Sequence, residues 1–505
     1  MTQVSPIEIA VCLAFLTLTV GLGISARWWK RGDRSIAELG EWGLGGRQFG
    51  TWITWFLLGG DFYTAYTVIA VPALVYSTGA GGFFALPYTI IVYPIVFATM
   101  PRLWTFAHRH GCVTAADVVQ VQYGSRLLAL AVALSGCIAT MPYIALQLVG
   151  LEIVSRALGL SGEVPLLIAF VALALYTYFS GLRAPALIAL VKDLMIYVVV
   201  LAAVAVIPAR LGGYAAVFHA ARQTLAARST GSLLLAPAQV VPYATLALGS
   251  ALAAFLYPHT LTGVFAARSA GTIRRNAILL PAYTLVLGMI ALMGYMALAA
   301  RIAVAEPNNV VPALLAAMFP PWFVGFALAA IAVCALVPAT VMSIGAANLI
   351  SRNVWRVYVH PAATAREETE VAQMVSLLVK VGALLFVIFL PVKYAVYLQL
   401  LGGLWILQTL PAVLLGLFMR GLSPPALIAG WLAGTIWGTW TVFADGLAPV
   451  HRMMLMGTPY GIYTGLLAVT LNVTVTVMGT AWMRMPIAGR RDRLAAKTGE
   501  TSAGA

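Results

Sequence analysis

Asp61 is a single carboxylate inside an apolar stretch, residues 51–72, that is long enough to cross a bilayer. A charged side chain at the centre of a spanning helix costs about 2.5–3.5 kcal/mol, so it usually faces a protein interior, a water-filled cavity or a transported ion. Gly59 and Gly60 come directly before it and weaken the helix at the same place. The alternative, a carboxylate that reaches the headgroups, requires a position near a helix end, whereas mostly apolar residues flank Asp61 on both sides. We therefore expect Asp61 to take part in function.

A second interrupted stretch lies five predicted spans later. It runs through Gly249 and Ser250 to Pro258. Two such spans cross the bilayer in opposite directions, as an inverted repeat of five plus five helices requires. In secondary transporters, a pair of Gly- or Pro-interrupted spans at corresponding positions is the best sequence pointer to the binding site. The structural alternative is that glycine and proline are common in membrane helices generally.

The composition indicates that both interrupted stretches belong to membrane helices. The chain is 62% hydrophobic and 9% charged, whereas soluble domains carry about 25% charged residues. We expect an all-α polytopic membrane protein with a single transmembrane domain over residues 1–485 and a disordered cytoplasmic tail over residues 486–505. Hydropathy predicts thirteen spans, at about 7–27, 51–77, 82–105, 127–157, 164–181, 184–208, 234–258, 277–301, 322–350, 372–392, 394–418, 424–444 and 460–483.

The placement of basic residues predicts the orientation. With the N-terminus outside, the inner segments hold 22 of the 30 Lys and Arg residues and the outer segments hold seven, with Lys380 left inside a span. Cytoplasmic loops carry this excess in membrane proteins. The asymmetry predicts an outer N-terminus and a cytoplasmic C-terminus, and it explains the net charge of +14 by the bilayer, without a nucleic acid partner.

Three segments of the first half form a set of motifs. Residues 42–50 read Trp-Gly-Leu-Gly-Gly-Arg-Gln-Phe-Gly, residues 114–126 run from Thr-Ala-Ala-Asp to Tyr-Gly-Ser-Arg, and residues 176–184 read Tyr-Thr-Tyr-Phe-Ser-Gly-Leu-Arg-Ala with Asp193 following. This set resembles the sodium:solute symporter family. The first segment is similar to its Leu-Gly-Gly-Arg signature, the second to its cytoplasmic loop and the third to its Tyr-Thr segment.

Within that family, three further segments are most similar to bacterial monocarboxylate permeases. They are residues 141–150, 257–268 and 336–348. The similarity covers roughly residues 5–485. The function it implies is secondary transport that imports short-chain monocarboxylates such as pyruvate, lactate, acetate or propionate. The implied location is the bacterial inner membrane.

The resemblance also implies the architecture. It is a LeuT-like fold of about thirteen helices, built as a five-plus-five inverted repeat with one extra N-terminal and two extra C-terminal helices. The two repeats would cover about residues 50–210 and 234–418. The substrate would then lie near mid-membrane, between the broken first helix of each repeat.

One departure from the family concerns the coupling ion. Sodium-coupled members carry a Ser-Thr pair in the ninth span, where this chain has Val337 and Pro338. Neither side chain offers an oxygen. The family's site also uses a backbone carbonyl at the position of Cys334, and Pro338 lacks the N–H that would bind that carbonyl. Thr340 and Ser343 are nearby, but we expect them to bond to their own helix.

We expect Asp61, Gly60 and the Cys334 carbonyl to couple ion binding to transport. A substrate carboxylate beside ionised Asp61 would be repelled strongly in a low-dielectric cavity, so Asp61 must be neutralised. Burial favours the protonated form of a carboxyl group, and a proton needs no oxygen cage. The missing hydroxyls therefore favour a proton over sodium. The substrate carboxylate would lie against N–H groups freed at a helix break.

Other polar residues near the two breaks are candidates for substrate binding or gating. His259 is a possible relay, with an interfacial histidine as the alternative, and Asp193 is a possible gating group that we interpret, with Lys192, as an interfacial ion pair near Arg183. The candidates for hydrogen bonds to substrate, with packing or bonding within the helix bundle as the alternative for each, are Thr64, Tyr66, Tyr143, Gln147 and Ser250.

Two other functions remain as alternatives. One is sodium-coupled symport of another small solute, such as an amino acid. The other is a membrane sensor built on a transporter fold, although no kinase-like segment follows Met485. The sequence has no metal-ligand spacing, no Walker-type loop and no nucleophile beside a His and an acid. We expect no enzymatic activity, no cofactor other than the coupling ion and no obligate protein partner.

Overall fold

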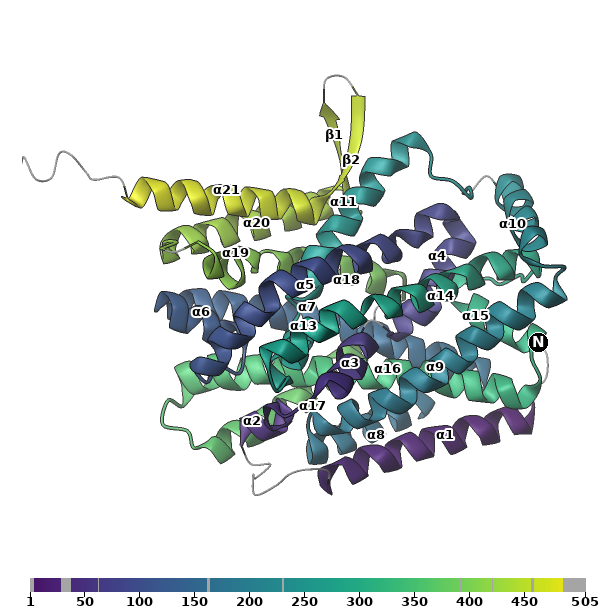
Figure 1. The fold of residues 1–505 in the computed structure, drawn as a ribbon, viewed down its shortest axis with the longest axis horizontal. Coiled ribbons are helices and arrows are strands. Elements are labelled where there is room, and N and C mark those ends of the chain that lie inside the picture. The colour runs from purple at the N-terminus through teal and green to yellow at the C-terminus, as the bar shows by residue number, and fades with distance from the viewer. Residues whose placement is uncertain are drawn as a thin grey trace, which may run out of the picture.

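The structure, a computed structural model, forms a bundle in which most helices run along one direction (Figure 1). It describes residues 4–28, 38–61, 63–160, 164–228, 231–389, 392–419, 421–455 and 458–484. The predicted tail, residues 486–505, lies outside the described residues. α1 begins at the right of Figure 1 and α21 ends at the left, so the first helix begins and the last helix ends at opposite ends of the bundle.

The first expected repeat begins with a broken helix. It contains α3 (Thr51–Gly60), α4 (Val71–Thr78), α5 (Ala85–Arg109), α6 (Ala115–Tyr123), α7 (Arg126–Ala157), α8 (Val164–Ser180) and α9 (Arg183–Arg210). Between α3 and α4 the chain leaves the α-helix after Gly60 and resumes as a π-helical turn, Tyr66–Ala70. Gly59 lets the ring of Tyr283 approach so closely that a Cβ there would overlap it.

The second expected repeat also begins with a broken helix. Its helices are α11 (Pro237–Ala254), α12 (Pro258–Ala266), α13 (Ala270–Leu279), α14 (Pro281–Ala299), α15 (Val310–Met318), α16 (Pro321–Leu349), α17 (Ala365–Phe389), α18 (Val392–Leu407) and α19 (Leu410–Val413). α11 and α12 meet at a bend of 49°. Pro258 begins α12, where its missing N–H costs no helical hydrogen bond.

The remaining elements lie before, between and after these repeats. They are α1 (Pro6–Ser25), α2 (Leu39–Trp42), α10 (Tyr214–Arg228), α20 (Pro424–Ala444), α21 (Thr464–Arg484), β1 (Val450–Leu455) and β2 (Thr458–Tyr463). β1 and β2 form an antiparallel hairpin. The all-α expectation missed this hairpin. The last span, predicted from residue 460, therefore starts at Thr464.

The structure supports the predicted spans with differences in detail. Within the described residues, nine helices are long and apolar enough to cross a membrane, or eleven when the two bent pairs are counted. Two predicted spans fall below that length limit: α8 has 17 residues, and the span at 51–77 is broken. The count of thirteen therefore stays a prediction.

α16 is the buried centre of the bundle. Almost every residue from Phe323 to Leu349 is buried, and the helix continues as a π-helix, Ile350–Val359. Pro338 lies inside it without ending it. α1, α7, α9, α12 and α17 all pack on this helix. A side chain on α16 between Phe323 and Leu349 therefore faces mostly protein.

The end of the bundle that we expect to be cytoplasmic is held by a polar network. Thr114 and Asp117 form a capping box at the start of α6. The same Asp117 accepts a hydrogen bond from Asn353, at 2.7 Å, and lies 3.5 Å from Arg352. Arg352 and Arg356 both pair with Glu368 on α17. The network joins α6 to the α16–α17 turn.

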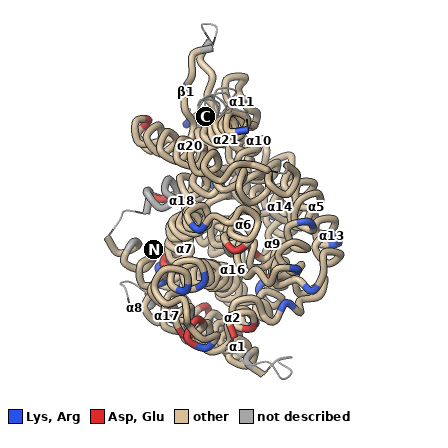
Figure 2. Tube along the Cα trace, turned by 90° about the vertical axis from the view of Figure 1, so that its left-hand side faces the viewer, with Lys and Arg blue, Asp and Glu red and all other residues tan. Residues whose placement is uncertain are grey.

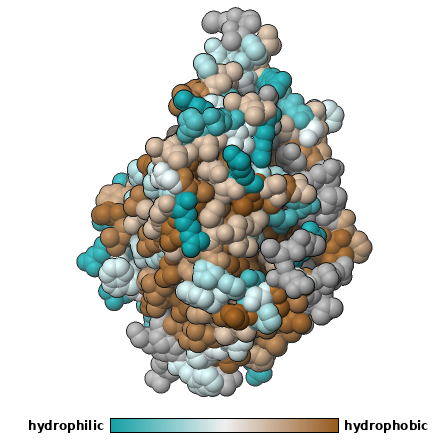
Figure 3. Space-filling model, turned by 90° about the vertical axis from the view of Figure 1, so that its right-hand side faces the viewer, coloured by the Kyte–Doolittle hydropathy of each residue, from teal (hydrophilic) through white to brown (hydrophobic). Residues whose placement is uncertain are grey.

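Basic residues gather at one end of the bundle (Figure 2). Figure 2 looks onto the left end of Figure 1, where Lys and Arg gather around α6, α13 and α17. Figure 3 looks onto the opposite end, where hydrophilic residues form separate patches among apolar ones. This distribution is the one expected for a basic cytoplasmic face.

Cysteine labelling tests the orientation. Exposed His219 on α10 lies at the expected outer end, and exposed His110, after α5, lies at the expected inner end. A membrane-impermeant maleimide should label a His219→Cys variant in intact cells and a His110→Cys variant only after permeabilisation. The four native cysteines are buried, and burial raises the pKa of the Cys112 thiol to about 11, so background labelling should be low. The reverse pattern would show that the orientation is wrong.

Candidate functional site

The two helix breaks meet at Asp61. Its Oδ2 accepts a hydrogen bond from the Thr260 hydroxyl, at 3.0 Å, and lies 3.5 Å from Nε2 of His259. Asp61 ends α3, whereas His259 and Thr260 are in the first turn of α12. All three side chains are buried. The carboxylate singled out in the sequence therefore joins the two broken helices.

A cavity of about 80 Å³, measured as space open to the centres of water molecules, lies beside this contact. Its walls come from both broken helices and from α5, α7, α18 and β2. The residues that line it with polar side chains include Asp61, Tyr66, Tyr143, Ser250, Tyr257, His259, Thr260 and Gln399. This volume holds several water molecules or a small organic ion.

Four polar atoms of the cavity lining have no partner within the described protein. They are Oδ1 of Asp61, Nδ1 of His259, the hydroxyl of Tyr257 and Oε1 of Gln399, and all four are buried. Buried polar atoms are almost always hydrogen-bonded, so unpaired ones point to water, an ion or a ligand. Their convergence on one cavity is typical of a binding site for a small polar molecule.

Aromatic rings fix the position of His259. The rings of Tyr143 and Tyr257 lie 5.6 and 5.2 Å from its imidazole. Tyr143 also shares a side-chain hydrogen bond with Thr64 in the break of the other helix. The imidazole is therefore held between the two tyrosines with one nitrogen toward Asp61.

Of the five predicted substrate contacts, Tyr66, Tyr143 and Ser250 line the cavity and two do not. Gln147 accepts a hydrogen bond from the backbone N–H of Ala65, at 3.0 Å, and donates to the carbonyl of Tyr143. Thr64 accepts from the N–H of Thr67. Gln147 and Thr64 thus satisfy backbone groups that the break leaves without helical partners.

Lys192 and Asp193 form the expected ion pair, but inside the bundle. They form an ion pair of 3.0 Å, and both are fully buried on α9. The Lys192 ammonium donates to the carbonyls of Gly60 and Tyr63, at 2.5 and 3.1 Å. Arg183 pairs instead with Glu41. The ion pair was predicted correctly, but its burial and its contacts at the break were not, because hydropathy does not show that a lysine amine can reach a broken backbone across the bundle.

The expected sodium position on α16 offers no side-chain oxygen at Val337 or Pro338. Thr340 and Ser343 donate to carbonyls of their own helix, at 2.9 and 2.8 Å, as predicted. The Gly60 carbonyl already binds Lys192. The described residues around this position do not fit a sodium ion, which needs several free oxygens.

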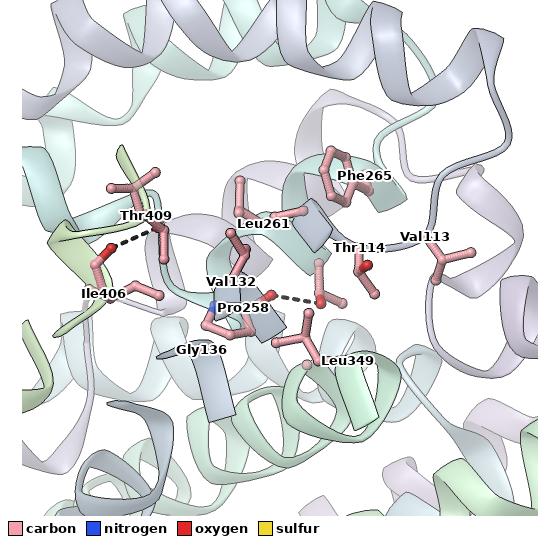
Figure 4. Close-up of a pocket in the computed structure, with 14 residues that line it drawn as sticks. Val113, Thr114, Val132, Gly136, Pro258, Leu261, Phe265, Leu349, Ile406 and Thr409 are labelled. Carbon is pink, nitrogen blue, oxygen red and sulfur yellow. Dashed lines mark hydrogen bonds between the residues drawn. The ribbon is translucent and has the colours of Figure 1, made fainter. Parts of the chain in front are cut away.

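The side of the second break that faces the start of α6 is tightly packed. A pocket there, with open space of about 20 Å³, holds one or two waters. Figure 4 shows Pro258, Leu261 and Leu349 around it. A Cβ on Gly136 or Gly345 would collide with the start of α12, so α12 lies close against both α7 and α16. A pocket of this volume is too small for an organic substrate.

Comparison with known proteins identifies the family. The model of the sodium:solute symporter family matches residues 42–438. The chain belongs to the sodium:solute symporter family. It is 60% identical to a monocarboxylate transport permease protein of Rhizobium johnstonii, over 95% of this chain and 98% of that one. It is 33% identical to the uncharacterized symporter YodF of Bacillus subtilis, over 89% and 88% of the two chains.

Solved structures agree on the fold of this symporter. A Na⁺-coupled sialic acid symporter in a substrate-bound, outward-open state superposes with a TM-score of 0.77, over 94% of this chain and 97% of that one, at 14% identity. This likeness confirms the LeuT-like fold. Family and fold are those of multi-pass membrane transporters.

Several residues at the symporter's site were missed in the sequence. Tyr257 and Thr260 flank the chosen His259, and Gln399 is a polar residue inside a predicted span, which is a usable signal. Lys192 was noticed but placed at the interface. No sequence pattern pointed to Tyr463, which enters the cavity lining from β2.

Replacing Gln147 with Met should destabilise the symporter, because the buried Ala65 N–H then loses its acceptor. Such a loss costs about 1–3 kcal/mol. We expect a lower melting temperature in detergent, measured by intrinsic fluorescence. Gln239→Met is the matched control, since Gln239 caps the Ala236 N–H at the exposed start of α11. Equal losses in both variants would contradict a special role for Gln147.

Proposed function

We propose that this chain is a secondary active symporter that imports short-chain monocarboxylates, such as pyruvate, lactate, acetate or propionate, with protons as the coupling ion. Its place would be the bacterial inner membrane, with the N-terminus outside. The observation that carries the proposal is the cavity where Asp61 and His259 meet, with four unpaired polar atoms. The 60% identity to a monocarboxylate permease supports the substrate class.

The cavity suits a small anion. The hydroxyl of Tyr257 and Nδ1 of His259 can both donate to a carboxylate, and neither has a protein partner. His259 and Thr260 are in the first turn of α12, where the helix dipole favours a negative charge. Phe84, Tyr88 and Leu400 supply an apolar wall for a short carbon chain. A cavity of about 80 Å³ favours acids of a few carbons over larger solutes.

Charge balance favours the proton. Asp61 and a substrate carboxylate in one buried cavity would repel each other if both were ionised. Protonated Asp61 can remain there, because Asp61 lines the cavity and its Oδ1 has no partner within the described protein. Deprotonation on the cytoplasmic side would then repel the substrate and release it. The imidazole of His259, 3.5 Å away, is placed to pass the proton.

Sodium-coupled transport of another small solute is the second candidate. The neighbours favour it, because the sialic acid symporter is Na⁺-coupled and a sodium/pantothenate symporter of Escherichia coli is 28% identical over 35% of this chain. Proteoliposomes separate the two candidates. Radiolabelled pyruvate should accumulate under an inward proton gradient alone and not under a sodium gradient alone. Sodium-driven uptake without a proton gradient would overturn the proton proposal.

Asp61→Asn should abolish proton-driven accumulation but retain exchange of labelled for unlabelled pyruvate, because asparagine keeps the size and cannot release a proton. Both rates can be measured in the same proteoliposomes. Asp445→Asn is the matched control, since Asp445 forms the same kind of Asp–His contact with His451, but on the outer surface. Normal proton-driven accumulation by Asp61→Asn would exclude Asp61 as the coupling group.

Tyr257→Phe should raise the KM for pyruvate by about tenfold, which corresponds to about 1.4 kcal/mol for one hydrogen bond to a charged group. The change removes the unpaired hydroxyl and retains the ring that packs on His259. Tyr463→Phe is the control, because that hydroxyl already bonds to the Leu400 carbonyl, at 3.4 Å. If KM rises equally in both variants, Tyr257 does not contact the substrate through its hydroxyl.

A further inference from the structure

The Lys192 ammonium occupies a place suited to a cation. It is fully buried, and its Nζ lies 2.5 Å from the Gly60 carbonyl, 3.1 Å from the Tyr63 carbonyl and 3.0 Å from Oδ1 of Asp193. The two carbonyls flank the point where α3 breaks off. Unwound carbonyls of broken helices are the groups that coordinate transported cations in secondary transporters.

We propose that the Lys192 ammonium is a tethered cation that takes the place of a coupling sodium ion at the α3 break, so that the symporter works without sodium. The proposal rests on the chain being an ion-coupled transporter, but not on which acid it carries. Removing the ammonium would leave a negatively charged pocket of carbonyl and carboxylate oxygens that a small monovalent metal ion could enter.

Three oxygens from three residues surround the Lys192 ammonium. It donates hydrogen bonds to the carbonyls of Gly60 and Tyr63, and its charge is paired with Oδ1 of Asp193, 3.0 Å away. A buried charge is tolerated when it is both paired and hydrogen-bonded. Asp193 is in turn held by the hydroxyl of Tyr283, at 2.6 Å. The amine is therefore fixed in position and does not hang loosely in the bundle.

Space at the break also fits the amine. A Cβ on Gly60 would lie 2.9 Å from Nζ of Lys192 and 3.3 Å from Oδ2 of Asp193. Only glycine lets the broken helix come this close to α9. A metal ion and the ammonium cannot share these carbonyls, because both occupy the same position with the same charge.

The facing helix agrees with this assignment. Cys334 on α16 interacts electrostatically with both Lys192 and Asp193, so α16 passes beside the pair. Its next turn presents Val337 and Pro338, which provide no side-chain oxygen. A satisfied ammonium needs no further ligand, whereas a sodium ion with two carbonyls and one carboxylate would still need more. Apolar residues at 337 and 338 are thus compatible with a lysine ammonium at the break, but they provide no ligand for a sodium ion.

If the cation at the break is fixed, Asp61 is the group that couples proton binding to transport. Lys192 acts electrostatically on Asp61 from the other side of the break. Asp193 balances most of that charge locally, since it forms the direct ion pair. The break would thus hold a permanent cation, the Lys192 ammonium, on the α9 side. On the cavity side it would hold the Asp61 carboxylate, which binds and releases a proton during transport.

The experiment compares the purified wild-type symporter with Lys192→Ala in sodium chloride and in choline chloride. Wild type should show the same melting temperature and the same pyruvate uptake in both salts. Lys192→Ala should lose uptake in choline and melt at a lower temperature, and sodium should raise both again. A structural role alone would not make a variant depend on sodium.

Lys380→Ala is the matched control. Lys380 is also a buried lysine, but it lies on α17 and donates to Ser376, away from the break. Its removal should create no sodium effect. Sodium stimulation of Lys380→Ala equal to that of Lys192→Ala would overturn the assignment.

Two other results would overturn the proposal. One is sodium-dependent uptake or stabilisation of the wild type, which can be measured even if Lys192→Ala fails to fold. The other is a folded Lys192→Ala that sodium does not affect. The melting measurement needs no substrate, so it still tests Lys192 if the chain does not carry pyruvate and the proposed function fails.

Discussion

The structure depends on one constraint, which is that a backbone broken inside a membrane protein must find new hydrogen-bond partners. An unsatisfied N–H or C=O costs several kcal/mol in lipid. At the α3 break, the carbonyls of Gly60 and Tyr63 bind Lys192, and the N–H of Ala65 binds Gln147. These partners come from α9 and α7. The break is therefore stable only because two other helices are held against it, and the cavity exists because the break does.

The same break separates two electrostatic tasks. On the α9 side, a lysine and an aspartate neutralise each other and carry no unpaired charge into the cavity. On the other side, Asp61 meets the first turn of α12 with one oxygen bonded to Thr260 and one free. A carboxylate held in this way can change its charge without loss of its position. That property is what coupling to a proton requires, whereas a sodium cage requires several fixed oxygens.

Sequence reasoning identified the correct helices but not all the correct roles. Asp61 stood out because a carboxylate is costly in lipid, and it does lie where the two breaks meet. Gln147 stood out for the same reason, yet its amide caps the break and does not reach the cavity. The lysine beside Asp193 was assigned to the interface because it lies near the start of a predicted span. The carbonyls that it binds are more than a hundred residues away, and local sequence cannot show such contacts.

The sequence by itself determined the membrane class, the approximate spans, the family resemblance and the two broken helices, because hydropathy and glycine or proline act locally. The tertiary structure decided which polar groups meet. It brought His259 and Thr260 to Asp61, placed the ammonium of Lys192 on the carbonyls of Gly60 and Tyr63, and paired β1 with β2 where only helices were expected. These outcomes depend on the packing of helices remote in sequence, since a buried polar atom takes whichever partner the bundle brings within reach.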